Sequence, residues 1–147
     1  STTRALENLM VTVNNNDVMR HFLYGGNATN RKGSFSAEHF PQALLYRGYL
    51  PHRLVGILNQ RFRDGAIDAV VYSYSTPIAW RDNGVWIVPK VRYSTTTRRH
   101  QYAVRYAVDY REIPVDAGIE EYLAVIEGRI LYSHNYRGGI GTYSKVA

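Results

Sequence analysis

One segment of the chain brings together the residue types that bind negatively charged oxygen. Residues 93–101 read Tyr-Ser-Thr-Thr-Thr-Arg-Arg-His-Gln, so a run of hydroxyl side chains is followed by two arginines and a histidine. If a helix begins here, its free backbone N–H groups and the positive end of its dipole face the same space as the arginines. The segment therefore predicts a phosphate site. In the alternative interpretation, Thr95 or Thr96 only caps the helix and the arginines face water.

The residues around this segment extend the predicted site. Lys90, Arg92 and Arg105 add positive charge along the same approach. Tyr93 or Tyr102 offers a ring on which a base can stack. The predicted nucleic-acid and phosphate contacts are Lys90, Arg92, Tyr93, Thr95, Thr96, Thr97, Arg98, Arg99, His100, Tyr102 and Arg105.

Positive charge is concentrated in the middle of the chain. The net charge of the 147 residues is +6, and residues 47–105 hold ten basic and three acidic side chains, a local balance of +7. Residues 1–46 balance to +1 and residues 106–147 to −2. Clustered positive charge is typical of proteins that bind polyanions, whereas a merely solvated surface is the alternative interpretation.

Tyrosine is the second unusual feature of the composition. The chain has 13 Tyr against 2 Trp and 4 Phe, and several tyrosines stand directly beside an arginine. Interleaved arginine and aromatic residues suit contacts with the bases and backbone of a nucleic acid. Tyrosine is also a favoured strand residue, so β-structure alone is the alternative explanation.

Motifs for catalysis and for metals are missing from the sequence. The chain has no cysteine, which excludes disulfides, thiolate catalysis and zinc sites built on sulfur. His100 has the titration range of a general acid or base, but the other histidines are scattered without metal-ligand spacing. We therefore expect no enzyme activity, no cofactor and no metal.

A helix and a hairpin are expected to position the predicted site. Residues 98–108 fit a helix, although Tyr and Val also alternate as they would in a strand. Residues 67–75 and 78–80 read as strands, and the Asp-Asn-Gly sequence at 82–84 predicts a tight hairpin turn. Residues 85–88 are the expected return strand.

The remaining elements are shorter or less regular. The other predicted helices and strands are a helix at 18–24, a strand at 43–49, a helix at 54–62, a helix at 117–127 and a strand at 130–132. A shared pattern, Ala, two aliphatic residues, Tyr and a later Pro, relates residues 43–51 to residues 69–77 and raises an internal repeat as a hypothesis.

Together these elements predict a single α+β domain over residues 1–132. Its fold class is a small, mostly antiparallel sheet built on the 67–93 hairpin, with two or three helices on one face. Residues 133–147 contain glycine and tyrosine and are expected to form a C-terminal tail. No apolar run approaches the length of a membrane-spanning helix, so no membrane partner is expected.

Two motifs in order carry a resemblance to a known family. Residues 72–80 read Tyr-Ser-Tyr-Ser-Thr-Pro-Ile-Ala-Trp, and residues 93–101 follow after the predicted hairpin. Over residues 70–101 the chain resembles an uncharacterised family of small proteins encoded by tailed phages of actinobacteria. The resemblance implies a phage protein that acts in the host bacterial cytoplasm, and it assigns no functional residues.

The leading hypothesis is a non-enzymatic phage protein that binds nucleic acid, with DNA as the expected form, through a basic face. The alternative is a host-directed or anti-defence protein that binds a bacterial protein or a small nucleotide. A structural component of the virion is the third hypothesis. We also expect a homodimer, formed through an exposed sheet edge or the tyrosine-rich surface.

Overall fold

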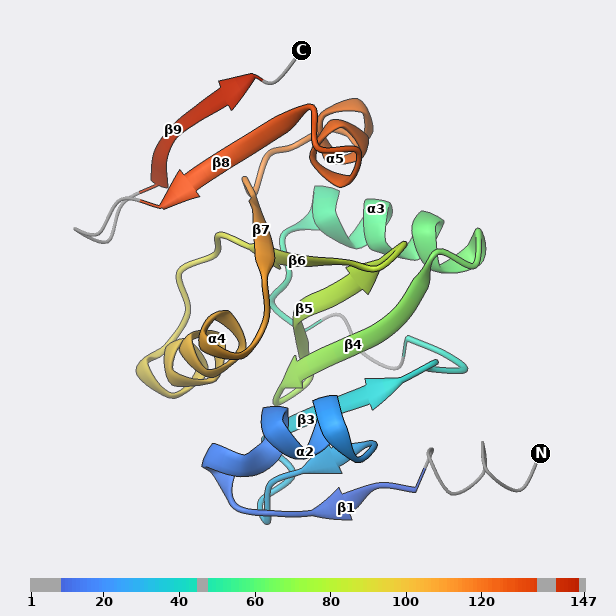
Figure 1. Cartoon of the computed structure of the whole chain (residues 1–147), viewed down its shortest axis with the longest axis vertical. Coiled ribbons are helices and arrows are strands. Elements are labelled where there is room, and N and C mark those ends of the chain that lie inside the picture. Colours follow the sequence, from blue (N-terminus) through green and yellow to red (C-terminus); the bar gives the residue numbers. More distant parts are fainter. Residues whose placement is uncertain (1–8, 45–47, 135–139, 146–147) are drawn as a thin grey trace.

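The computed structural model describes residues 9–44, 48–134 and 140–145 (Figure 1). The helices are the 3₁₀ turn η1 (Asn15–Asp17), α2 (Val18–Tyr24), α3 (His52–Arg63), α4 (Thr95–Ala107) and α5 (Ile119–Ile126). The strands are β1 (Val11–Thr12), β2 (Ala28–Thr29), β3 (Phe35–His39), β4 (Ile67–Ser73), β5 (Thr76–Asp82), β6 (Val85–Pro89), β7 (Tyr110–Ile113), β8 (Ile130–His134) and β9 (Ile140–Lys145).

The central sheet contains seven strands in chain order, β1 to β7, and mixes two kinds of pairing. The inner pairs from β2 to β6 are antiparallel, whereas β1 pairs with β2 and β6 pairs with β7 in parallel. Parallel neighbours need a crossover connection. Helices α2 and α4 provide these crossovers, α2 between β1 and β2 and α4 between β6 and β7 (Figure 1). Strands β8 and β9 form a separate antiparallel pair.

The predicted fold class was wrong, because the sheet is mixed and helices cover both of its faces. Strand β4 shows the physical reason, since its side chains are buried on both sides. Ala69 and Val71 belong to the apolar core under α2 and α4, and Val70 and Tyr72 belong to the core under α3 and α5. A strand that is apolar on both faces must be covered from both sides.

Most local predictions in the middle of the chain are confirmed. The helices at 18–24 and 54–62 correspond to α2 and α3, and the ambiguous stretch at 98–108 lies mostly in helix α4, not in a strand. The predicted turn joins β5 to β6, and both Asn83 (φ 47°) and Gly84 (φ 79°) adopt the left-handed conformation that such tight hairpins require.

The strand predicted at 43–49 was wrong. Ala43 and Leu44 are not in a strand, Gly48 has a positive φ of 46°, and residues 45–47 lie outside the described ranges. The backbone N–H of Tyr49 donates to the side-chain oxygen of Thr76 at 3.0 Å, and not to a strand partner. The two segments of the hypothetical internal repeat therefore have different structures where both are described.

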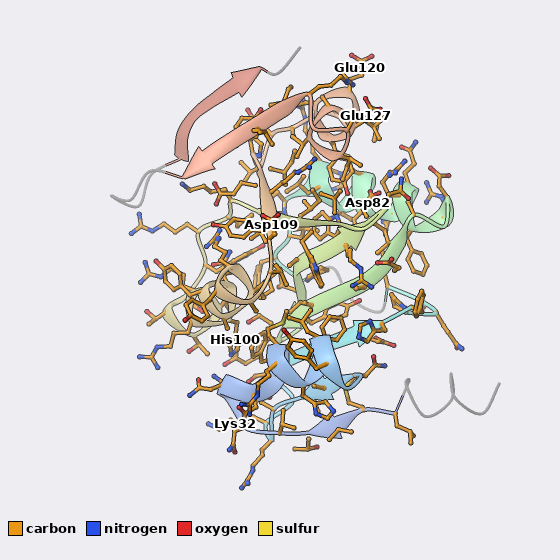
Figure 2. All side chains as sticks on the ribbon, in the orientation of Figure 1. Lys32, Asp82, His100, Asp109, Glu120 and Glu127 are labelled. Atoms are coloured by element: carbon orange, nitrogen blue, oxygen red, sulfur yellow. The ribbon has the colours of Figure 1, made fainter. Side chains whose placement is uncertain are left out.

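A buried polar cluster joins the sheet to the helices above it. Asp82 is fully buried and accepts two hydrogen bonds from Arg61, each at 2.9 Å, and one from the Tyr122 hydroxyl at 2.7 Å. The Trp80 indole in turn donates to that hydroxyl at 2.8 Å. Figure 2 labels Asp82 beside α3, deep among the side chains. The cluster thus connects α3, β5 and α5 with its carboxylate fully paired.

No helix in the described ranges is long and apolar enough to cross a membrane.

Replacing Arg61 tests how much this cluster contributes to the stability of the fold. In Arg61→Ala, the Asp82 carboxylate is left buried without its cation, so we expect the free energy of unfolding to fall by about 3–5 kcal/mol. The matched control is Arg63→Ala in the same helical turn, where the exposed side chain predicts a change within about 0.5 kcal/mol. Urea denaturation measures both, and equal losses would contradict a structural role for the ion pair.

Candidate functional site

The two sequence motifs meet inside the protein, between α4 and β4. Ser94 caps α4, accepting a hydrogen bond from the Thr97 N–H at 3.5 Å. The hydroxyl of Ser73 lies 3.0 Å from the Thr97 hydroxyl and 2.7 Å from Nδ1 of His100. The His100 ring stacks on Phe35 of β3, with centroids 4.4 Å apart. These contacts hold the first two turns of α4 against the sheet.

The Ser73–His100 pair has the spacing of a nucleophile and its base, but its surroundings do not give a substrate access. Ser73 is 1% exposed and His100 is 2% exposed. Burial against an apolar ring lowers the pKa of His100, so the imidazole is held neutral. A nucleophile must reach its substrate, so we interpret this cluster as a lock that fixes α4 in place.

This lock determines which face of α4 is exposed. Thr97, His100 and Val104 face inward, so the opposite side presents Arg99, Tyr102 and Tyr106 at the spacing of one helical face. Tyr106 is 97% exposed and Tyr102 is 64% exposed. Such exposure is unusual for large aromatic side chains, and it makes this face a candidate binding surface.

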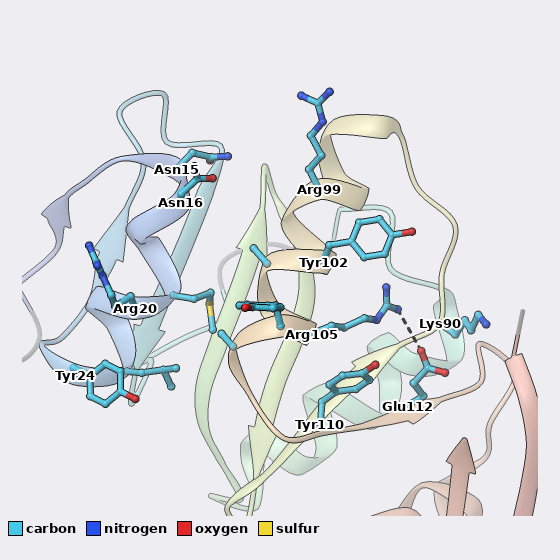
Figure 3. Close-up of a pocket in the computed structure, with 15 residues that line it drawn as sticks. Asn15, Asn16, Arg20, Tyr24, Lys90, Arg99, Tyr102, Arg105, Tyr110 and Glu112 are labelled. Atoms are coloured by element: carbon cyan, nitrogen blue, oxygen red, sulfur yellow. Dashed lines mark ion pairs between the residues drawn. The ribbon is translucent and has the colours of Figure 1, made fainter. Parts of the chain in front are cut away.

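A groove of about 1390 Å³ runs along this face, between α2 and α4 (Figure 3). Both helices lie on the same side of the sheet and share one apolar core. The charged and aromatic residues that line the groove are Arg20, Tyr24, Lys90, Arg99, Tyr102, Arg105, Tyr106, Tyr110 and Glu112. Positive charges and tyrosine rings therefore meet in a single hollow.

The cations of the groove differ in how far they are already neutralised. Arg105 forms an ion pair with the buried Glu112 at 3.5 Å, and Arg20 pairs with Asp17 at 2.7 Å. For Lys90 and Arg99, no ion pair is found among the described residues. The positive charge available to a ligand is therefore concentrated on Lys90 and Arg99.

Burial and charge also act on Tyr110. Its pKa is raised chiefly by burial and further by the negative charge of Glu112, with a partial offset from Arg105. The hydroxyl therefore stays protonated and remains a hydrogen-bond donor at neutral pH.

Some of the predicted site residues meet in the groove. Lys90, Arg99, Tyr102 and Arg105 all line it, although Lys90 precedes α4 and the others belong to the helix. Figure 3 shows Tyr102, Arg105 and Lys90 on the side of α4 away from Arg20 and Tyr24, and Arg99 directed outward from the start of the helix. The structure thus brings these four together on the α4 side of one cavity.

The other predicted residues lie elsewhere. Thr97 and His100 are buried in the lock described above, and Tyr93 packs against the core, where burial raises its pKa. Arg98 is half-buried. Arg92, Thr95 and Thr96 are exposed around the start of α4 but do not line the groove.

The sequence analysis missed the opposite wall of the groove. Arg20 and Tyr24 stand four residues apart in the helix predicted at 18–24, so they share one face. That spacing is visible in the sequence, but no feature of the local sequence indicated that this helix would lie beside α4. Tyr106 shares a face with the predicted Tyr102, whereas Tyr110 and Glu112 reach the groove from β7.

Among the described residues, no group of three or more Asp, Glu or His side chains is arranged to hold a metal ion.

The chain belongs to a protein family described as "Family of unknown function (DUF8033)", whose profile matches residues 11–113, more than half of the sequence. The matched region runs from β1 to the end of β7 and includes every residue that lines the groove. Comparison with curated proteins and with solved structures gives no match.

The lock predicts a loss of stability in acid. The pKa of His100 is lowered in the folded protein, so below its ordinary value near 6.5 the unfolded chain binds a proton that the folded chain does not. The free energy of unfolding should therefore fall as the pH decreases from 7.5 to 5, with a contribution of at most about 1.4 kcal/mol per pH unit.

His100→Gln cannot titrate and should lack this contribution, whereas His52→Gln, at an exposed position on α3, should keep it. Urea denaturation across the pH range compares the three proteins. The same pH dependence in the wild type and in His100→Gln would show that the lock is not the titrating element.

Proposed function

We propose that this protein binds single-stranded nucleic acid in the groove between α2 and α4, and that it does so without catalysing a reaction. The observation that carries the proposal is that Arg99, a cation with no ion pair among the described residues, shares the α4 wall with exposed rings. Arg99, Tyr102 and Tyr106 follow one another along α4. Proteins that bind single strands combine a positive groove for the phosphates with aromatic rings on which bases stack.

The charges also favour one orientation of the strand. Glu112 is a buried carboxylate at the groove and its charge is offset by Arg105, so this pair contributes little to the attraction of phosphate. Phosphates are better placed near Lys90 and Arg99, neither of which forms an ion pair with another described residue. The bases then turn toward the tyrosines, an arrangement open to a single strand, whereas the bases of a duplex are already stacked on one another.

The cellular setting of this activity rests on the motif resemblance. The resemblance over residues 70–101 supports a phage protein that acts in the host bacterial cytoplasm. Proteomics of phage-infected cells and of purified particles would separate this setting from a role in the virion. A chain found in infected cells but not in particles favours the intracellular role.

A host protein is the second candidate partner, and the exposure of Tyr24 and Tyr106 favours it. Both rings are almost wholly exposed, at 88% and 97%, and tyrosine is enriched at protein interfaces. Nuclease treatment before affinity capture distinguishes the two candidates. A complex that survives without nucleic acid favours the protein partner.

Fluorescence anisotropy with a labelled twelve-residue oligothymidylate tests the proposal directly. We expect binding at 50 mM salt that weakens as salt is added, because counterions are released from the strand. Arg99→Ala should reduce the slope of log K against log salt by about 0.7, the value for one phosphate contact on a single strand.

Tyr106→Ala should weaken binding by about 1–3 kcal/mol, the contribution of one stacked base, without changing that slope. Tyr49→Ala removes an equally exposed ring that does not line the groove, and Arg63→Ala removes a cation that does not line it. Both controls should bind as the wild type does. The absence of binding to oligothymidylate and oligouridylate at 50 mM salt would refute the proposal.

A further inference from the structure

A hydrogen bond connects the groove to the turn between β2 and β3. Asn15 lines the groove, and its side-chain oxygen accepts a hydrogen bond from the Asn30 amide at 3.0 Å. The same amide nitrogen donates to the Ser34 hydroxyl at 2.9 Å, and the Asn30 side-chain oxygen accepts from the N–H groups of Ser34 and Phe35. Asn30 therefore fixes the turn beside the groove.

The fixed turn carries two exposed cations. Arg31 and Lys32 stand at its tip, between Asn30 and Gly33, and the Gly33 N–H closes the turn by donating to the Asn30 carbonyl at 3.1 Å. Neither Arg31 nor Lys32 has an ion pair among the described residues. Figure 2 shows Lys32 pointing away from the body of the protein. Both charges are therefore available to an anion.

An exposed tyrosine lies next to this turn. The backbone N–H of Tyr74, at the tip of the β4–β5 hairpin, donates to the Ser34 carbonyl at 2.8 Å. Tyr74 has a φ of 56°, which is rare for an aromatic residue, and its side chain is 58% exposed. Its ring centroid is 6.3 Å from that of His100 on α4. The tip of the hairpin thus lies between the turn and the helix that forms one wall of the groove.

We propose that Arg31, Lys32 and Tyr74 form a second contact surface, which binds the nucleotides that flank those held in the groove. This inference rests on the proposed function, because it extends the same strand beyond the same site. The surface repeats the chemistry of the groove, with cations for phosphates and a ring for a base. The hydrogen bonds through Asn30 and Ser34 connect it to the groove by a fixed path.

The length of the ligand provides the test, because the second surface is reached only by a strand longer than the groove. Binding of labelled oligothymidylates of four and twelve residues is measured for the wild type, for Arg31→Ala/Lys32→Ala and for Tyr74→Asn. Asparagine tolerates the left-handed conformation at position 74, so this variant removes the ring and keeps the hairpin. Circular dichroism checks that each variant is folded.

We expect the double variant and Tyr74→Asn each to weaken binding of the twelve-residue strand by about tenfold and that of the four-residue strand by less than about twofold. The salt slope for the long strand should fall by about 1.4 in the double variant, as for two phosphate contacts. A long strand offers more binding registers than a short one, which raises its apparent affinity. Each variant is therefore compared with the wild type on a strand of the same length, so that this statistical factor cancels.

The matched control is Arg63→Ala/Arg129→Ala, which removes the same charge from exposed positions outside the groove and the turn. It should leave both affinities within about twofold of the wild type. Equal weakening at both lengths, or equal weakening by the control, would overturn the second surface and leave the groove intact. If the wild type bound neither strand, the proposed function itself would fail, and the second surface with it.

Discussion

The contact of Ser73 with Thr97 and His100 is the interaction on which the candidate surface depends. Helix α4 has two tyrosines on one side and Val104 on another, so its sequence alone allows more than one rotation about its axis. The buried hydroxyls and the imidazole remove that freedom, because each would lose a hydrogen bond if the helix turned. With this face fixed inward, Arg99 and Tyr106 face the groove. Within the two sequence motifs, Ser73, Thr97 and His100 thus position the helix, whereas Arg99 lines the groove.

The charge of the central third reaches the surface only in part. Arg61 and Arg81 are engaged with Asp82 and Asp68, at 2.9 and 2.6 Å, and Arg105 is paired with Glu112. These pairs hold elements of the fold together, so they contribute little to the attraction of a polyanion. The cations that remain without an ion pair among the described residues include Lys90, Arg92, Arg98 and Arg99, which lie within or just before α4. Net charge therefore overstated the positive charge that this region leaves without an ion pair among the described residues.

Local features of the fold could be predicted from the sequence, and long-range ones could not. The turn at Asn83 and Gly84 could be predicted from the sequence, because both residues tolerate a positive φ. The parallel pairing of β6 with β7 could not be predicted, because it depends on where the chain returns after α4. Part of the α4 wall of the groove could be predicted, because Arg99 and Tyr102 are close in sequence and share one helix. Tyr24 was missed because only the tertiary fold places α2 beside that wall.

The two faces of the sheet differ in how they relate to the matched family region. Every residue of the groove lies within residues 11–113, so the groove is formed wholly by that region. The opposite face of the sheet also depends on residues beyond 113. Tyr122 of α5 lies outside the matched region and completes the hydrogen bonds of the buried Asp82. A buried carboxylate that loses a donor is destabilised. Helix α5 therefore supports the groove indirectly, by stabilising the sheet on which α4 packs.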